Sequence, residues 1–153
     1  MIHFSDFLRP DRIKLSITAT RKREAIKEVA NILDGVPEIR DKERFLKEIF
    51  ERESVEATAI GNGVAVPHAR TDAVTDLVIA VGRSQPGVDF GSVDGKPVRL
   101  VFVMGTPRAN VTNYLKILAQ LSRVVRSPGC VDKAMAADTA QKIVDVFRAL
   151  EEP

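Results

Sequence analysis

The sequence predicts an α/β fold in which a central mixed β-sheet is sandwiched by α-helices on both faces of a single domain. Two apolar runs rich in β-branched residues, at 76–84 and 96–106, have the composition of buried strands. Segments with apolar residues at helical spacing precede and follow these runs. Because helices and turns both separate the strands, parallel and antiparallel pairs are expected in one sheet. The strand order stays open.

Two helices are expected before the strands. Thr20 can cap a helix whose apolar positions recur as far as Leu33, where a following glycine and proline end it. Asp41 then opens a second helix over 41–54, with an apolar stripe on one face and charged residues on the other. Arg52 falls on the last turn of this helix.

Turns and three more helices account for the rest of the chain. Turns are signalled by Pro86-Gly87 and Asp94-Gly95. The helices are expected at 114–125, 128–137 and 139–150. Thr112 or Asn113 can cap the first of them, and Ser127 can cap the second, with Pro128 at its first helical position.

The composition is typical of one globular domain spanning residues 1–153. Of the 153 residues, 44% are hydrophobic and 29% charged, which suits a continuous core without disulfides or metal ions. The 23 basic and 21 acidic residues are scattered, so no basic tract indicates nucleic-acid or lipid binding. Cys130 is the only cysteine, which excludes an intramolecular disulfide. Residues 1–15 carry charges instead of an apolar core, and no run approaches the roughly 20 apolar residues of a membrane helix. We therefore expect a cytoplasmic protein with no stable membrane insertion.

The stretch EATAIGNGVAVPHARTDAV, residues 56–74, holds one of only two histidines in the chain. A solitary histidine is more often structural than catalytic, and a GNG triplet is a common hairpin turn. The glycines also permit positive φ and close backbone approach, however, so the amides of Gly61, Asn62 and Gly63 can face an anion. Pro67 fixes the backbone immediately before His68, which is therefore expected on a stiff loop.

Two arginines strengthen the functional interpretation of His68. Arg70 follows it by two residues and Arg52 precedes it by sixteen. Planar guanidinium groups are favoured partners of phosphate oxygens. A nucleophilic imidazole surrounded by amides and arginines is what a transient phosphohistidine requires.

Other chemistries on the same residues find less support. A metal site would have only His3 and His68 as imidazole ligands, with Cys130 remote in the sequence. No G-x-S-x-G motif provides a serine nucleophile, and GNGVAV matches neither common nucleotide-binding loop. We therefore expect no metal and no organic cofactor.

The segment ESVEATAIGNGVAVPHARTDAV closely resembles the signature of the IIA components of the bacterial sugar phosphotransferase system, in the class that includes fructose-specific, mannitol-specific and nitrogen-regulatory IIA proteins. The resemblance extends along the chain, to RES at the end of the second helix, VDFGSVDGKPVRLVFVMGTP and YLKILAQLSRVV. It implies a mixed sheet between helices. It also implies that His68 accepts a phosphoryl group from the histidine-containing phosphocarrier protein and that Arg52 neutralises the phosphoryl charge.

Tyr114 departs from the pattern of this family. The family usually has a second histidine here, at the start of the third helix, where it contacts the phosphorylated histidine or its phosphoryl group. A tyrosine hydroxyl can donate one hydrogen bond to a phosphoryl oxygen but carries no positive charge near neutral pH. We expect Tyr114 either to bind the phosphoryl group, with Arg52 or Arg70 supplying the charge, or to pack in the core.

Three functions are compatible with this resemblance. The first is a stand-alone, nitrogen-regulatory type of phosphocarrier whose phosphorylation state controls the binding of target proteins, which the absence of fused IIB or IIC segments favours. The second is the IIA component of a fructose- or mannitol-type transporter that passes the phosphoryl group to a cysteine of a IIB domain. The third is a degenerate module that binds partners without being phosphorylated, because Tyr114 replaces the second histidine. In each case the partners are proteins and not nucleic acid.

Overall fold

A six-stranded mixed sheet forms the middle layer of the structure, a computed structural model that describes residues 2–151. Its strands are β1 (Ile13–Lys14), β2 (Ala59–Gly61), β3 (Val64–Ala65), β4 (His68–Arg70), β5 (Val78–Val88) and β6 (Val98–Thr106). The order across the sheet is β1-β5-β6-β3-β2, with β4 also paired to β6. The central pair, β5 and β6, is antiparallel, whereas β3 and β4 run parallel to β6. The mixed sheet predicted from the sequence is thus confirmed.

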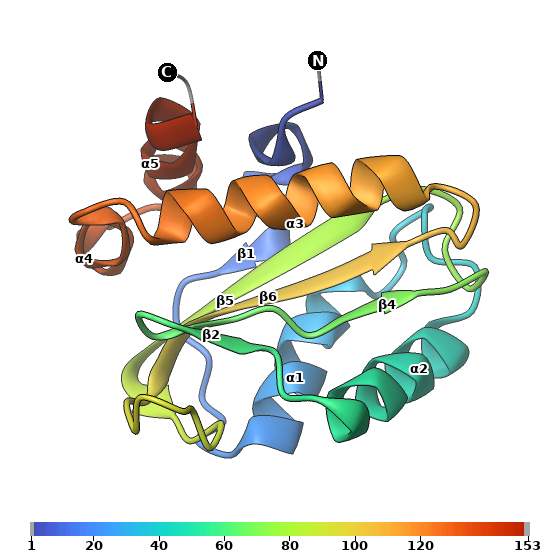
Figure 1. Cartoon of the computed structure of the whole chain (residues 1–153), viewed down its shortest axis with the longest axis horizontal. Coiled ribbons are helices and arrows are strands. Elements are labelled where there is room, and N and C mark those ends of the chain that lie inside the picture. The colour runs from blue at the N-terminus through green and yellow to red at the C-terminus, as the bar shows by residue number, and fades with distance from the viewer. Residues whose placement is uncertain (1, 152–153) are drawn as a thin grey trace.

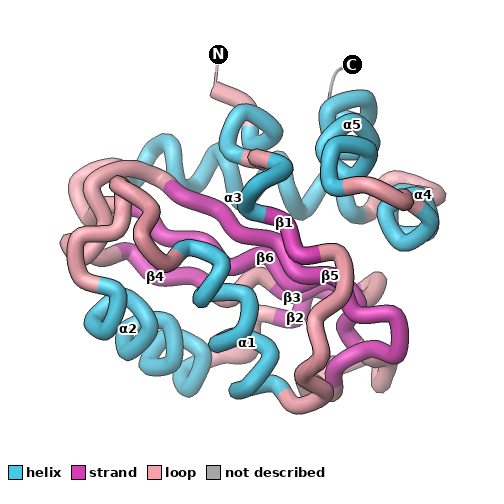
Figure 2. Tube along the Cα trace, turned by 180° about the vertical axis from the view of Figure 1, so that it is seen from behind, coloured by secondary structure: helices cyan, strands magenta, loops and turns pink. Residues whose placement is uncertain are grey.

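Helices cover both faces of this sheet (Figure 1). The helices are α1 (Lys22–Ala30), α2 (Lys42–Val55), α3 (Val111–Val125), α4 (Cys130–Ala136) and α5 (Ala140–Glu151), and short 3-10 helices lie at Phe4–Phe7, Pro10–Arg12 and Asn31–Leu33. Figure 2 shows α1 and α2 on one side of the sheet and α3 and α5 on the other. This arrangement confirms the predicted sandwich and the single domain. No helix within residues 2–151 is long and apolar enough to cross a membrane.

Side chains of β5 and β6 alternate between two apolar cores, as the pleat of a strand requires. One core, under α3 and α5, receives Ile79, Val81, Leu100, Phe102 and Met104. The other, over α1 and α2, receives Val78, Ala80, Val101 and Val103. At Gly105 the strand leaves room for α2, because a Cβ there would lie 2.5 Å from Cε1 of Phe45. The helix that carries Arg52 is therefore packed directly onto the sheet.

The helix starts show where local signals decided the structure and where they did not. Asp41 caps α2 as predicted, since its side chain accepts a hydrogen bond from Arg44 N at 3.0 Å. Thr20 does not cap α1, because Arg21 is the N-cap and pairs with Asp89 as an isolated β-bridge. That pairing holds the chain extended just before the helix. The prediction for Thr20 was therefore wrong.

Two further helix starts also differ from the prediction. The N-cap of α3 is Asn110 and not Thr112 or Asn113, so this helix begins before the predicted position. For α4 the N-cap is Gly129, whose φ of 78° is a left-handed conformation. This glycine turns the chain after Pro128, and the helix starts at Cys130 instead of the proline.

The predicted turns had different outcomes. Pro86-Gly87 lies inside β5, where the register with β6 shifts between Arg83 and Val88, so these residues form an irregularity within a long strand and not a turn between strands. Asp94-Gly95 forms the predicted turn, in which Asp94 Oδ1 accepts a hydrogen bond from Lys96 N at 3.0 Å.

Candidate functional site

His68 lies at the edge of the sheet, on β4. The segments β3 and β4 follow one another along the same side of β6, separated by Val66 and Pro67. The Pro67 carbonyl accepts a hydrogen bond from Met104 N at 3.0 Å, and His68 stands opposite Met104 in the register. The structure thus corrects the expectation of a loop: a proline fits an edge strand, where its missing N–H costs no ladder bond.

The imidazole of His68 is buried, with 7% of the residue exposed. Its Nδ1 lies 2.6 Å from the carbonyl oxygen of Val66. Because a carbonyl only accepts hydrogen bonds, Nδ1 carries the proton and Nε2 keeps its lone pair. Burial lowers the pKa of His68 below its ordinary value, and the charge of Arg52 lowers it further, against the opposing effects of the Val66 carbonyl and Glu53. His68 is therefore a neutral imidazole with a defined free nitrogen.

Tyr114 lies beside His68, at the start of α3. The two ring centroids are 5.6 Å apart with an interplanar angle of 45°. The guanidinium carbon of Arg70 lies 5.9 Å from the centroid of the Tyr114 ring. Tyr114 is also part of the core under α3, with 9% of the residue exposed, so the two predicted roles do not exclude each other. Burial raises the pKa of Tyr114 despite the nearby charges of Arg52 and Arg70, which keeps its hydroxyl protonated.

Arg52 lies on the last turn of α2, as the sequence predicted. Its Nη1 donates a hydrogen bond to the carbonyl oxygen of Glu56 at 2.9 Å, which anchors the side chain at the helix end. Its charge acts on the pKa values of both His68 and Tyr114. The structure therefore places Tyr114 against His68 and Arg70 near the Tyr114 ring, and the charge of Arg52 acts on both rings.

The glycine turn, Gly61–Asn62–Gly63, lies elsewhere. All three residues have positive φ, at 89°, 57° and 77°, and they connect β2 to β3. Val64 pairs with Leu100 and His68 with Met104. At roughly 3.3 Å per residue, these four positions along β6 separate the turn from His68 by about 13 Å or more. The predicted contribution of Gly61, Asn62 and Gly63 to a phosphoryl site at His68 is therefore not met, because the chain between them is extended.

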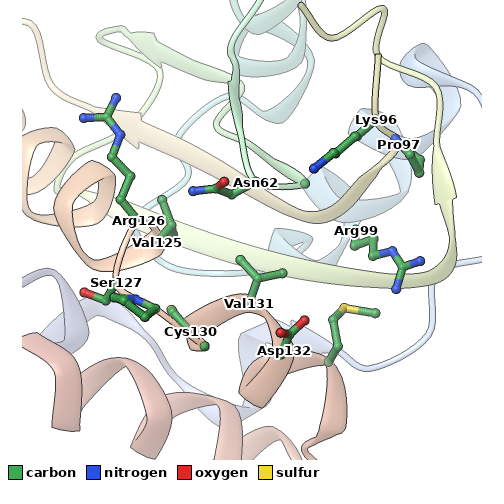
Figure 3. Close-up of a pocket in the computed structure, with 14 residues that line it drawn as sticks. Asn62, Lys96, Pro97, Arg99, Val125, Arg126, Ser127, Cys130, Val131 and Asp132 are labelled. Atoms are coloured by element: carbon green, nitrogen blue, oxygen red, sulfur yellow. The ribbon is translucent and has the colours of Figure 1, made fainter. Parts of the chain in front are cut away.

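Asn62 and Gly63 line a different depression, which we call the glycine-turn pocket. Its volume is about 670 Å³, and its lining includes Asn62, Gly63, Lys96, Arg99 and Arg126 but not His68. Figure 3 shows Arg99 and Arg126 on opposite sides of this pocket with their guanidinium groups turned away from each other. The two guanidinium groups therefore do not converge on one point.

Glu53, which follows Arg52 on α2, is a further residue of this region that the sequence patterns did not single out. Its side chain is 5% exposed and pairs with Lys22 Nζ at 2.8 Å. It also accepts hydrogen bonds from the amide and the hydroxyl of Thr58. A signal was present: Glu53 stands four residues after Ile49 on the apolar stripe that includes Phe45, where a carboxylate must be paired to be tolerated.

The chemistry available at His68 is that of a neutral nucleophile beside permanent cations and a hydroxyl donor. Nε2 can attack an electrophile, while Arg52 and Arg70 can bind the oxygens of a tetrahedral anion. Within residues 2–151, no three His, Cys, Asp or Glu side chains form a group that could hold a metal ion.

Comparison with known families agrees with this geometry. The model of the family described as "Phosphoenolpyruvate-dependent sugar phosphotransferase system, EIIA 2" matches residues 6–149. The chain belongs to this EIIA type-2 family.

Its curated relatives include sugar-specific and nitrogen-regulatory proteins. The chain is 33% identical over 143 residues to the fructose-specific EIIABC component of Bacillus subtilis, covering 94% of this chain but only 22% of that protein. It is 32% identical to the fructose-specific EIIA component of Haloferax volcanii, covering 92% of this chain and 91% of that protein. It is 29% identical to the nitrogen regulatory protein of Pseudomonas aeruginosa, covering 95% of each. As an EIIA type-2 protein it is therefore similar to both kinds.

Solved structures of EIIA type-2 proteins share its fold. The nitrogen regulatory protein IIA-Ntr of Neisseria meningitidis superposes with a TM-score of 0.85 at 24% identity, covering 94% of this chain and 97% of that one. The IIA mannitol enzyme of Escherichia coli, solved in complex with phosphorylated IIB mannitol, gives 0.80 at 18% identity, covering 93% and 97%. These likenesses identify the sheet and its helices as the family fold.

Proposed function

We propose that this EIIA type-2 protein is a histidine phosphocarrier, in which Nε2 of His68 accepts a phosphoryl group from the phosphohistidine of the histidine-containing phosphocarrier protein. The observation that carries the proposal is the hydrogen bond from Nδ1 to the Val66 carbonyl at 2.6 Å. It selects the tautomer in which Nε2 is the nucleophile. Burial, which lowers the pKa of His68, keeps this nitrogen unprotonated at neutral pH.

The transfer needs no proton movement on His68. The Nε2 lone pair attacks phosphorus in line, a new N–P bond forms, and the N–P bond of the donor breaks with its electron pair returning to the donor imidazole. The proton stays on Nδ1, hydrogen-bonded to the Val66 carbonyl oxygen, throughout. Arg52 and Arg70 stabilise the equatorial oxygens, as positioned cations do in phosphoryl transfer.

Tyr114 completes this arrangement in place of the usual second histidine. Its raised pKa leaves a hydroxyl that can donate to a phosphoryl oxygen. The positive charge that a histidine would add comes instead from Arg52 and Arg70, whose charges both act on Tyr114. This supports a working phosphocarrier over a degenerate binding module.

We propose a nitrogen-regulatory type of role in the cytoplasm for the domain spanning 1–153. Adding a dianionic phosphoryl group to His68 would change the charge of a partner-facing edge and so control binding of target proteins. The alternative is transport, in which a IIB domain accepts the phosphoryl group. The fructose-specific relatives and the E. coli complex with phosphorylated IIB mannitol support that alternative.

Phosphorylation can be tested by incubating the protein with radiolabelled phosphoenolpyruvate and the general phosphotransferase enzymes. We expect acid-labile, base-stable label on the wild type and none on His68→Gln. The other histidine provides the control, because His3→Gln should label like the wild type. Label that persists in His68→Gln would refute the proposal.

Substitutions at Tyr114 separate the carrier from the degenerate module. We expect Tyr114→Phe to slow labelling about tenfold, since a hydrogen bond to a charged group is lost, and Tyr114→His to stay within a few-fold of the wild type. If the wild type does not label and Tyr114→His labels rapidly, the degenerate module is the correct function.

A further inference from the structure

Glu53 holds a buried carboxylate whose oxygens are both engaged. Oε2 accepts a hydrogen bond from Thr58 N at 2.9 Å and pairs with Lys22 Nζ at 2.8 Å. Oε1 accepts from the hydroxyl of Thr58. A carboxylate at this depth is tolerated only with such partners. It ties the end of α2 to α1 and to the chain entering β2.

Backbone hydrogen bonds continue from Thr58 to the imidazole. Thr58 is itself 5% exposed, and its carbonyl accepts a hydrogen bond from Val66 N at 3.0 Å. The carbonyl of the same Val66 accepts the Nδ1 proton of His68 at 2.6 Å. A continuous path of hydrogen bonds therefore runs from Glu53 on the helix to the ring of His68 at the sheet edge.

We propose that Glu53 is a positioning residue for phosphoryl transfer: through Thr58 and Val66, it fixes the carbonyl that selects the tautomer of His68. This inference rests on the proposed function, because it concerns the same nucleophile. Glu53 acts through other groups and does not itself touch the phosphoryl group.

The position of Glu53 in the helix gives it a second effect. Arg52 precedes it on the same turn of α2 and is anchored to Glu56 O at 2.9 Å. By clamping this turn to Thr58, Glu53 also sets the distance between the guanidinium and the imidazole. Glu53 thus orients both the Arg52 guanidinium, which would bind the phosphoryl oxygens, and the His68 imidazole, which would attack the phosphorus.

The charge of Glu53 acts on the imidazole as well. It raises the pKa of His68, opposing burial and Arg52. Glu53→Gln keeps the shape and one acceptor but removes this charge, whereas Glu53→Ala removes the connection altogether. The two variants therefore separate the electrostatic effect from the positional one.

Glu28 on α1 offers a matched control. It accepts hydrogen bonds from Thr18 N at 3.0 Å and Ala19 N at 2.9 Å, and pairs with Lys14 Nζ at 2.9 Å. It thus has the same kinds of partner as Glu53, a lysine, backbone amides and a threonine hydroxyl. None of these contacts leads to His68, so Glu28→Ala reproduces the loss of a carboxylate with the same kinds of partner, 15% exposed against 5% for Glu53, without affecting the imidazole.

The test compares Glu53→Ala, Glu53→Gln and Glu28→Ala with the wild type by the initial rate of labelling and by ¹⁵N NMR of the His68 ring. We expect Glu53→Ala to label at least tenfold more slowly and to show a mixture of ring tautomers. Glu53→Gln should recover most of the rate and the Nδ1–H tautomer. Glu28→Ala should stay within twofold in rate with an unchanged tautomer. Wild-type rate and tautomer in folded Glu53→Ala would overturn the inference.

Two further results keep the outcome clear. If Glu53→Ala fails to fold, Thr58→Val removes only the hydroxyl of the path and should shift the tautomer in the same direction; an unchanged tautomer in Thr58→Val would then overturn the inference. If the wild type does not label, the proposed function fails, yet the NMR spectra still report whether Glu53 controls the tautomer.

Discussion

The two ends of the edge formed by β3 and β4 differ in the property that matters for chemistry, which is burial. At one end, the glycine turn opens on a pocket whose cations, Arg99 and Arg126, point apart. At the other end, His68 is 7% exposed and bonded to the Val66 carbonyl. Charges acting through a low-dielectric interior are stronger than those at the surface. Glycines mark one end in the sequence and arginines mark the other, but only the buried end has a nucleophile, the His68 imidazole, with a defined free nitrogen.

The two ends of this edge therefore have different roles, one structural and one chemical. The glycines provide the positive φ angles of a hairpin, and their substitution should affect stability. The residues around His68 should affect transfer. A variant at the glycine turn that slows labelling, or a variant near His68 that lowers only stability, would contradict this division.

The largest contrast is expected between Arg52 and Arg99. Arg52→Ala should lower the initial rate of His68 labelling about 100-fold, the typical effect of removing a positioned donor that stabilises a transition state. Arg99→Ala, at the glycine-turn pocket, should leave the rate within twofold. Labelling assays with equal protein concentrations measure both, and comparable losses in the two variants would contradict the assignment of the site to the buried end.

An intermediate effect is expected on the pH dependence. Because burial lowers the pKa of His68 below 6.5, more than half of the protein keeps the neutral, nucleophilic imidazole at pH 6.5, and labelling at this pH should stay above half of its maximum. Between 6.5 and the lower native pKa, the unfolded chain binds a proton and the folded chain does not, so the free energy of unfolding should fall as the pH falls through this window. NMR titration of the ring and urea denaturation measure the two effects. His68→Gln should lose this part of the stability change, and Arg52→Ala should raise the pKa of His68.

The smallest effect on transfer is expected at Gly63. Its φ is 77°, and an added Cβ would meet only ordinary contacts, the nearest being Pro97 O at 3.5 Å. Gly63→Ala should therefore cost about 1–2 kcal/mol of unfolding free energy from the left-handed backbone, with the labelling rate unchanged. Urea denaturation and the labelling assay check the two parts. A slower labelling rate with an unchanged free energy of unfolding would instead indicate that the glycine turn contributes to the phosphoryl site.

Predictions based on local patterns were confirmed where no contact with a distant segment opposes the local signal. The two apolar runs became β5 and β6, and Asp41 capped α2, because the strand tendency of an apolar, β-branched run and an N-cap are decided within a few residues. Thr20 failed as a cap because its neighbour Arg21 pairs with Asp89, far along the chain. A tertiary contact overrode a sound local signal.

The same distinction between local signals and tertiary contacts applies to the candidate site. His68, Arg52, Arg70 and Tyr114 were named from the sequence, and the structure places the two rings together, with the charge of Arg52 acting on both and Arg70 near the tyrosine ring. Gly61, Asn62 and Gly63 were assigned to the same site because their backbone amides, a few residues before His68, can face an anion. Glu53 was passed over because its partners, Lys22 and Thr58, come from other parts of the fold. Proximity along the chain misleads in a strand, where each residue adds about 3.3 Å.

By itself the sequence determined the layered α/β architecture and pointed to His68, since periodicity, composition and the PHAR motif are local properties of the chain. Only the tertiary structure decided that His68 lies on a strand, that the Val66 carbonyl accepts a hydrogen bond from its Nδ1, and that the glycine turn lies at the opposite end of the edge. These depend on strand register and burial. Both are set by contacts between segments far apart in the sequence, which no local pattern contains.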